Sequence, residues 1–301
     1  MSVLWVFLDG VGLGPPTSDN PLARLDLPAF QALAGGQRWT REAEAVREPG
    51  HVFVPIDATL GVEGLPQSGT GQGALFTGKD AVRAHGRHFG PYPPTKVRPL
   101  VEAHGVFARL APVVGAERLA FANAYPERFF RVVAARNRWT VTTLAASAAG
   151  VRLRGAGDLA AGLALASDLT GEGWRRVIDG EHALISEAQA ASALLDLGRD
   201  HDFVLLEYYL TDKAGHSQDA GRAASVLRSL DRFFAALLGG LDEHLLVVTS
   251  DHGNLEDLGT KSHTRHPVPL VALGPGAGAF AGARSILDVT PAVVQAVPAT
   301  R

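Results

Sequence analysis

The stretch LLVVTSDHGN, Leu245–Asn254, decides the fold and the chemistry that we expect of this chain. It starts with four apolar residues, two of them β-branched, which is typical of a buried strand in a parallel sheet. Asp251 and His252 follow directly, and Gly253 lets the chain turn. In open α/β sheets, ligands bind just beyond the carboxyl ends of the strands. A carboxylate beside an imidazole there suits a metal ion, although an N-capping Asp beside a surface His explains the pair equally well.

Two further apolar runs end with the same residue types. Asp9 follows Val3–Leu8, and Asp212 and His216 follow Phe203–Leu210. Each run has the length and the apolar character of a buried strand. We therefore expect carboxylates and imidazoles beyond the ends of three strands of one sheet.

A helix connects the last two of these strands. In Ala220–Leu238 the apolar residues recur on one helical face, and a pair of glycines ends the pattern. Strand, helix and strand in this order form a βαβ unit, whose two strands run parallel. Another expected strand, Val268–Leu273, has His263 and its rival His266 at its entrance.

Parallel strands would bring these polar positions to one edge of the sheet. One Asp–His pair there is ordinary, whereas three Asp and three His are enough for two metal ions with open coordination positions. The candidate ligands are Asp9, Asp212, His216, Asp251, His252 and His263.

A glycine-rich loop, Gln67–Gly73, places the hydroxyls of Ser68 and Thr70 just before the helix-like run Ala74–Thr77. Free amides at a helix start bind anions, and glycines let a phosphate approach the backbone. A purely structural turn explains the loop equally well.

Together these motifs resemble the alkaline phosphatase superfamily, and within it the metalloenzymes that include cofactor-independent phosphoglycerate mutase and phosphopentomutase. The resemblance rests on FLDGVG, the glycine-rich loop, TDKAGHS, TSDHGN and SHTRHPVP, which occur in that order. It implies a doubly wound, mostly parallel α/β sheet sandwiched by helices. The catalytic core would comprise residues 1–79 and 201–301, and residues 80–200 would form an inserted cap that binds substrate.

The resemblance also implies two divalent ions, for which we expect Mn, with Zn or Mg as alternatives. Asp212, His216 and His263 would hold one ion. The other would be held by the nucleophilic hydroxyl together with the remaining ligands, Asp9, Asp251 and His252.

The spacing of glycines in the resembled motif favours Thr70 as the nucleophile, because Gly73 and Gly78 follow it at three and eight residues. Ser68 is the alternative. A hydroxyl is a poor nucleophile at neutral pH until a metal lowers its pKa. In the expected cap, a phosphate or carboxylate clamp would come from basic residues, each of which is otherwise a solvated surface residue; the candidates are Arg83, Arg87, His88 and Arg98.

Composition narrows the classes of function. The net charge of −3 gives no electrostatic case for binding nucleic acid or an anionic membrane. The absence of cysteine excludes thiolate chemistry and leaves oxygen and imidazole as metal ligands. Neither a signal peptide nor an apolar run of the ~20 residues of a membrane helix is visible, so we expect a cytoplasmic protein.

These observations predict a two-metal phosphotransfer enzyme that acts on a small phosphorylated substrate through a phosphothreonine. A short cap admits water, which favours hydrolysis over the alternative, a phosphomutase. A sulfatase normally needs a Cys or Ser that becomes formylglycine, which does not suit a threonine. An alternative of another class is a non-catalytic protein that binds metal or a phosphorylated ligand.

Overall fold

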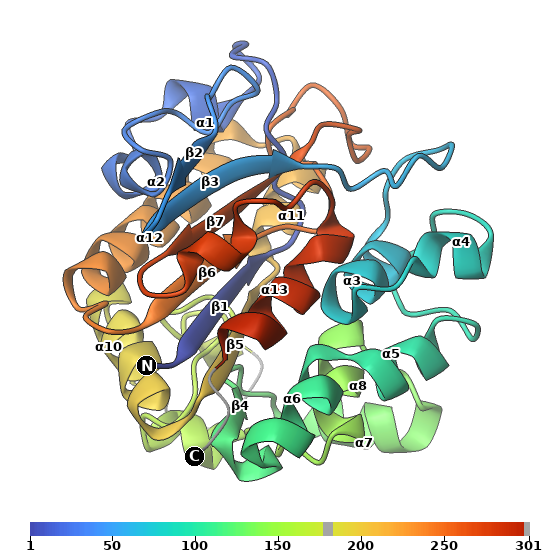
Figure 1. The fold of residues 1–301 in the computed structure, drawn as a ribbon. Helices are drawn as coiled ribbons and strands as arrows, with labels where there is room; N and C mark the ends of the chain where they lie inside the picture. Colours follow the sequence, from blue (N-terminus) through green and yellow to red (C-terminus); the bar gives the residue numbers. More distant parts are fainter. Residues whose placement is uncertain (177–182, 298–301) are drawn as a thin grey trace.

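The computed structural model describes residues 1–176 and 183–297 of the chain. Its strands form one sheet of seven in the order β2-β3-β7-β6-β1-β5-β4 (Figure 1). Strands β6, β1, β5 and β4 are parallel, whereas β7 runs antiparallel to its neighbours β6 and β3, and β2 to β3. The strands are β1 Val3–Leu8, β2 Val46–Glu48, β3 His51–Ile56, β4 Leu119–Phe121, β5 Phe203–Tyr208, β6 Leu245–Thr249 and β7 Val268–Leu273.

Helices cover both faces of this sheet. They are α1 Pro21–Arg24, α2 Pro28–Leu33, α3 Ser68–Thr77, α4 Ala81–His85, α5 Arg98–His104, α6 Val106–Val114, α7 Glu127–Arg136, α8 Val141–Ala148, α9 Ala156–Ala160, α10 Glu187–Asp200, α11 Leu210–Ser217, α12 Ala220–Gly239 and α13 Val289–Ala296. Trp5 and Phe7 of β1 share one buried cluster with α3, α5, α6, α8 and α13. Leu4 and Val6 share the other with α1, α2, α10, α11 and α12. The predicted doubly wound, mostly parallel α/β fold is confirmed.

The helix predicted at Ala220–Leu238 is α12. Its first turn is capped by Asp219, whose carboxylate accepts the backbone N–H of Arg222 at 3.0 Å. Its apolar face is buried, and Phe234 contacts Phe30 of α2 with 5.3 Å between ring centroids. No helix in the described part of the chain is long and apolar enough to cross a membrane.

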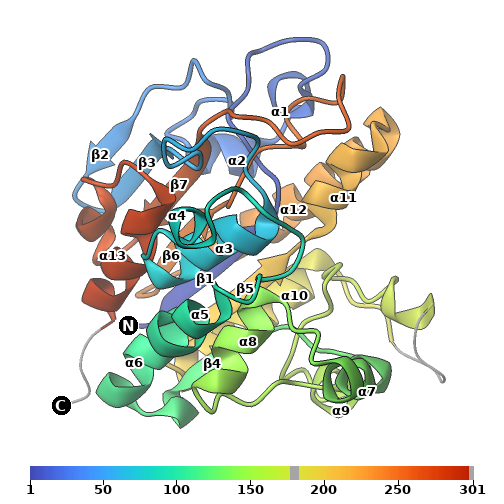
Figure 2. The same ribbon diagram turned by 90° about the vertical axis from the view of Figure 1, so that its right-hand side faces the viewer.

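The region expected to form a cap, residues 80–200, differs from that expectation. Strand β4 is hydrogen-bonded to β5 within the sheet, and Phe107 of α6 packs on Phe203 of β5 with ring centroids 5.4 Å apart. Apolar residues of α5, α6 and α8 therefore belong to the main core. Of this region, only α7, α9 and the segment up to residue 176 lie to one side of the main core (Figure 2). A small separate apolar cluster is found there, formed by Ala124, Leu159, Ala164, Ala166 and Trp174.

Candidate metal centre

The first candidate ligand cluster lies beyond β1 and β6. These strands pair in parallel with Phe7 opposite Thr249, so the residues after each strand meet at the carboxyl edge. Nε2 of His252 lies 3.3 Å from Oδ1 of Asp9 and 3.5 Å from Oδ2 of Asp251. Asp251 and His252 are fully buried, and Asp9 is 8% exposed.

The electrostatics of this cluster suit a cation. Burial, and then the charge of Asp251, raise the pKa of Asp9 well above its ordinary value. Burial, and then the charge of Asp212, raise the pKa of Asp251. Burial, and then the neighbouring His263, lower the pKa of His252. Without a cation these carboxyls therefore favour the protonated form, which a bound divalent ion would reverse.

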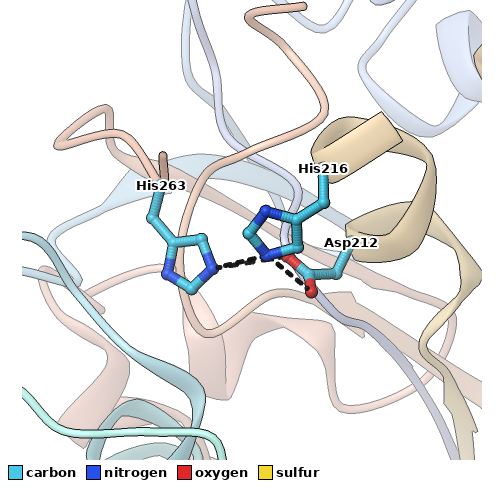
Figure 3. A group of neighbouring side chains, drawn as sticks. All are labelled: Asp212, His216 and His263. Atoms are coloured by element: carbon cyan, nitrogen blue, oxygen red, sulfur yellow. Dashed lines mark hydrogen bonds and ion pairs between the residues drawn. The ribbon is translucent and has the colours of Figure 1, made fainter. Parts of the chain in front are cut away.

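The second cluster joins α11 to the loop before β7 (Figure 3). One turn of α11 brings Asp212 and His216 together, with Oδ2 of Asp212 3.3 Å from Nε2 of His216. Nε2 of His263 lies 3.2 Å from that same His216 nitrogen and 3.6 Å from Oδ1 of Asp212. One carboxylate and two imidazoles thus converge, and every predicted carboxylate and imidazole ligand lies in one of the two clusters.

Backbone carbonyls orient the imidazoles of the second cluster. Nδ1 of His263 lies 2.7 Å from the carbonyl of Pro66, and Nδ1 of His216 lies 2.8 Å from that of Lys261. Because a carbonyl only accepts, each Nδ1 carries the proton and each Nε2 keeps its lone pair for the site. Asn254 supports the carboxylate, since its side-chain amide donates to Oδ1 of Asp212 at 2.6 Å.

The two clusters adjoin each other. The rings of His252 and His263 stack with centroids 3.8 Å apart and an interplanar angle of 16°. In the first cluster Oδ1 of Asp9 and Oδ2 of Asp251 are buried without a hydrogen-bond partner. Buried carboxylate oxygens without donors are costly, and a cation would satisfy both. The residues therefore fit two divalent ions with nitrogen and oxygen ligands.

The two candidate hydroxyls lie in different places. Oγ of Ser68, the first residue of α3, lies 3.0 Å from Nε2 of His252. Oγ1 of Thr70 lies instead against the loop after α4, accepting the backbone N–H of Phe89 at 3.0 Å and donating to its carbonyl at 3.3 Å. Thr70 follows Ser68 by about 200° around the helix, so the two side chains point in different directions. The alternative hydroxyl, Ser68, therefore lies at the first cluster, and Thr70, which we expected there, lies away from it.

Two glycines allow close backbone contacts around the site. A Cβ at Gly69 would lie 2.2 Å from the carbonyl oxygen of Tyr92 and 2.8 Å from that of Phe89. The backbone of the loop after α4 therefore rests directly on the first turn of α3. Gly10, with φ of +69°, lets the turn after β1 pass Asp212 in the same way, since its Cβ would meet Oδ1 at 2.6 Å.

The expected substrate contacts divide into two pairs. Arg83 is exposed and paired with Asp80 at 3.3 Å, and Arg98 donates to the carbonyl and side-chain oxygens of Asn137. These two guanidinium groups are engaged within the expected cap. Arg87 and His88 instead line a hollow of about 480 Å³ beside Gln67, the residue before Ser68.

Sequence reasoning missed one central residue, Glu256. Its Oε2 accepts the backbone N–H groups of Gly12 and Asn254, both at 2.8 Å. Its Oε1 accepts from the hydroxyl of Thr264 and lies 3.0 Å from Nδ1 of His266. This buried carboxylate therefore joins the loops that carry Asp9, His252 and His263. In the sequence, the only indication of this role was its position four residues after His252.

Sequence reasoning also missed Gln72, whose side-chain amide donates to Oδ2 of Asp9 at 3.2 Å. The fold and the paired clusters define an α/β protein with two adjoining groups of candidate metal ligands at the carboxyl edge of its sheet. The family model of the Metalloenzyme superfamily matches residues 179–298.

Among curated proteins, the 2,3-bisphosphoglycerate-independent phosphoglycerate mutase of Halobacterium salinarum is 32% identical over 127 residues. That match covers 38% of this chain and 25% of the mutase, so it spans about a quarter of the relative's length.

Two solved structures share the fold. The alkaline phosphatase of the Antarctic bacterium TAB5 matches with a TM-score of 0.53 and 13% identity, covering 98% of each chain. Leishmania mexicana phosphoglycerate mutase matches with a TM-score of 0.52 and 14% identity, covering 100% of this chain and 96% of the other. Residues 179–298 are thus similar to the Metalloenzyme superfamily, and the chain shares the fold of alkaline phosphatase and phosphoglycerate mutase structures.

Proposed function

We propose that the chain is a two-metal phosphotransfer enzyme that hydrolyses a small phosphoester through a phosphoserine at Ser68. The observation that carries this proposal is the 3.0 Å distance between Oγ of Ser68 and Nε2 of His252, inside the Asp9 cluster. The bound ions would lower the pKa of this hydroxyl and neutralise charge on the phosphoryl oxygens.

The residues of the chain would divide the work as follows. Asp9, Asp251 and His252 hold one ion beside Ser68, and the second cluster holds the other. Oγ of Ser68 forms a bond to phosphorus while the bond to the ester oxygen breaks, and the proton lost by the serine balances the one gained by the leaving alcohol. The positive end of the α3 dipole lies at Ser68 and favours the phosphoryl charge. Water then releases inorganic phosphate and restores the hydroxyl.

A second candidate is a phosphomutase, in which the phosphoryl group returns to another hydroxyl of the same substrate. The match to mutases favours it. We favour hydrolysis because a mutase must keep its intermediate away from water, and much of the expected cap is built into the core instead.

The test combines turnover with mapping of the intermediate. Chelated protein is reloaded with Mn²⁺, Zn²⁺ or Mg²⁺ and assayed on phenyl phosphate; we expect two ions per chain and metal-dependent release of phosphate. Ser68→Ala should lose turnover by several orders of magnitude while keeping both ions, and quenched wild type should carry phosphate on Ser68. Phosphate on Thr70, or an active Ser68→Ala variant, would refute the assignment.

Two further arms test the alternatives. Incubation with sugar phosphates and 3-phosphoglycerate, with both free phosphate and isomer followed, distinguishes hydrolysis from transfer. An isomer formed without phosphate release would establish the mutase. Two bound ions without turnover of any phosphoester would leave the non-catalytic binding protein.

A further inference from the structure

A cavity of about 890 Å³ lies beside the metal centre without containing any of its ligands. It is bounded by α7, α11, α12 and the segment 167–176, which lie together beyond the carboxyl edge of β5 (Figure 2). Its volume is in the range of cavities that hold small organic ligands. The function proposed above does not yet use this cavity.

Unpaired positive charge lines the cavity. Arg128 of α7, Lys213 of α11 and Arg222 of α12 come from three different helices. None of the three side chains forms an ion pair with a described carboxylate. Nζ of Lys213 lies 4.2 Å from the centroid of the Tyr209 ring, a cation–π contact that leaves its charge uncompensated.

The acidic residues of the same wall are already engaged. The carboxylate of Asp168 accepts the backbone N–H groups of Gly171 and Gly173. Glu172 pairs with Arg176 at 3.8 Å. The cavity therefore presents a net positive charge, and an anionic ligand would complement it.

Aromatic side chains supply the apolar part of the lining. The rings of Tyr125 and Phe129 lie with their centroids 4.1 Å apart and their planes tilted by 31°. Tyr209 and the buried Trp174 also line the cavity. A planar ring would gain offset stacking on such a surface in addition to apolar burial.

Helix α11 connects this cavity to the metal centre. Asp212 and His216 lie on one side of the helix, Lys213 lies about 100° round from Asp212, and Tyr209 is the N-cap residue of the same helix. The hydroxyl of Tyr125 also reaches Oε2 of Glu207 at 3.5 Å, so the cavity wall contacts the carboxyl end of β5. A phosphoester at the metal centre would thus have the cavity beside its leaving group.

Building on the proposed function, we propose that the cavity binds the leaving group of the substrate, and that this group is a planar, aromatic moiety with a negative charge of its own. The cations of α11 and α12 contact that charge, and the aromatic residues contact the ring. The enzyme would therefore select aryl-type phosphoesters that carry an additional anionic group.

The kinetic test compares 4-carboxyphenyl phosphate with phenyl phosphate in the Mn²⁺-loaded protein. We expect kcat/KM to be about tenfold higher for the carboxylated ester, which corresponds to one charge-assisted hydrogen bond. Arg222→Met and Lys213→Met should each reduce that ratio severalfold. The matched control is Arg228→Met, an exposed arginine of α12 outside the cavity, which should keep the ratio. Equal kcat/KM values for the two esters in the wild type would overturn the proposal.

A binding test separates this proposal from the proposed function. Quenching of the fluorescence of Trp174 by 4-hydroxybenzoate and by phenol needs no turnover, and Trp174→Phe identifies the signal. We expect 4-hydroxybenzoate to bind at least tenfold more tightly than phenol, with the difference lost in Arg222→Met. If phenyl phosphate is not hydrolysed, the proposed function fails and this titration still tests the cavity. Tight binding of 4-hydroxybenzoate without any preference in kcat/KM would overturn the assignment to the leaving group.

Discussion

Asp251→Asn should stabilise the protein without metal and lose most of that advantage with metal. In the folded chain the Asp251 carboxyl is fully buried, and its Oδ2 has no hydrogen-bond donor. Burial, and then the charge of Asp212, raise its pKa from 3.8 to about 8. An asparagine has nearly the same shape but needs no proton at this position.

The magnitude follows from proton linkage. In the unfolded chain this carboxyl is ionised at pH 7, so folding without metal must bind a proton, which costs up to about 4 kcal/mol for a pKa raised from 3.8 to about 8. The pKa of Asp251 is higher in the folded chain than in the unfolded chain. With respect to this group alone, the stability of the chelated wild type is therefore greatest below pH 4. It should fall as the pH rises from about 4 to about 8.

The assay is urea denaturation at pH 5, 6, 7 and 8, in chelator and in excess Mn²⁺. In chelator, Asp251→Asn should be more stable than the wild type at pH 7, with a flatter dependence on pH. In Mn²⁺ the difference should narrow, because the wild type gains about 2.7 kcal/mol at a hundredfold excess of metal over its Kd and the variant lacks a ligand. A variant that is less stable in chelator at pH 7 would refute the electrostatic account of this cluster.

Three other outcomes are expected. Glu256→Gln should lose about 1.5–3 kcal/mol of stability, because a hydrogen bond to a charged acceptor is replaced by a neutral one or lost. Its metal affinity should fall about 10–100-fold, and unchanged affinity in a metal titration would contradict the role of Glu256 in positioning the ligands. Burial raises the pKa of Glu207 from 4.5 to about 7, so chelated wild type should lose up to about 3 kcal/mol between pH 4.5 and 7, and Glu207→Gln should remove that loss in the same denaturation series. His263→Ala should leave one ion per chain by metal analysis and expose the face of His252; retention of two ions would show that His263 is not a ligand.

The ligands were predictable from the sequence because each follows a buried strand or precedes one. Val3–Leu8, Phe203–Tyr208 and Leu245–Thr249 are in parallel register, so Asp9, Asp212 and Asp251 had to meet at one edge. The loop before β7 reaches the same edge because β7 is antiparallel, which its sequence alone does not reveal.

The hydroxyl was not predictable in the same way. Ser68 and Thr70 are two residues apart, and either one fits a loop of glycines that precedes a helix. The helix begins at Ser68, and the backbone around Phe89 covers Thr70. That contact depends on a loop almost twenty residues away, and no local pattern encodes it.

The expected cap is a similar case, because its placement depends on contacts between distant segments. Leu119–Phe121 is a strand of three residues that pairs with β5, so this part of the expected cap belongs to the sheet. The helices α5, α6 and α8 then cover a face of that sheet instead of forming a domain of their own.

Glu256 explains how loops from separate strands hold ligands at fixed positions. Burial by itself would raise the pKa of this carboxyl, yet its hydrogen bonds to His266, Thr264 and backbone N–H groups hold the pKa below the ordinary value. It is therefore ionised in the folded chain, and its charge is shared by donors of the loops after β1, after β6 and before β7. Displacing any one loop would leave a buried carboxylate short of a donor, which is costly. The two clusters are thus held at a fixed distance from each other before any ion binds. Each ion then has to order only the side chains that coordinate it.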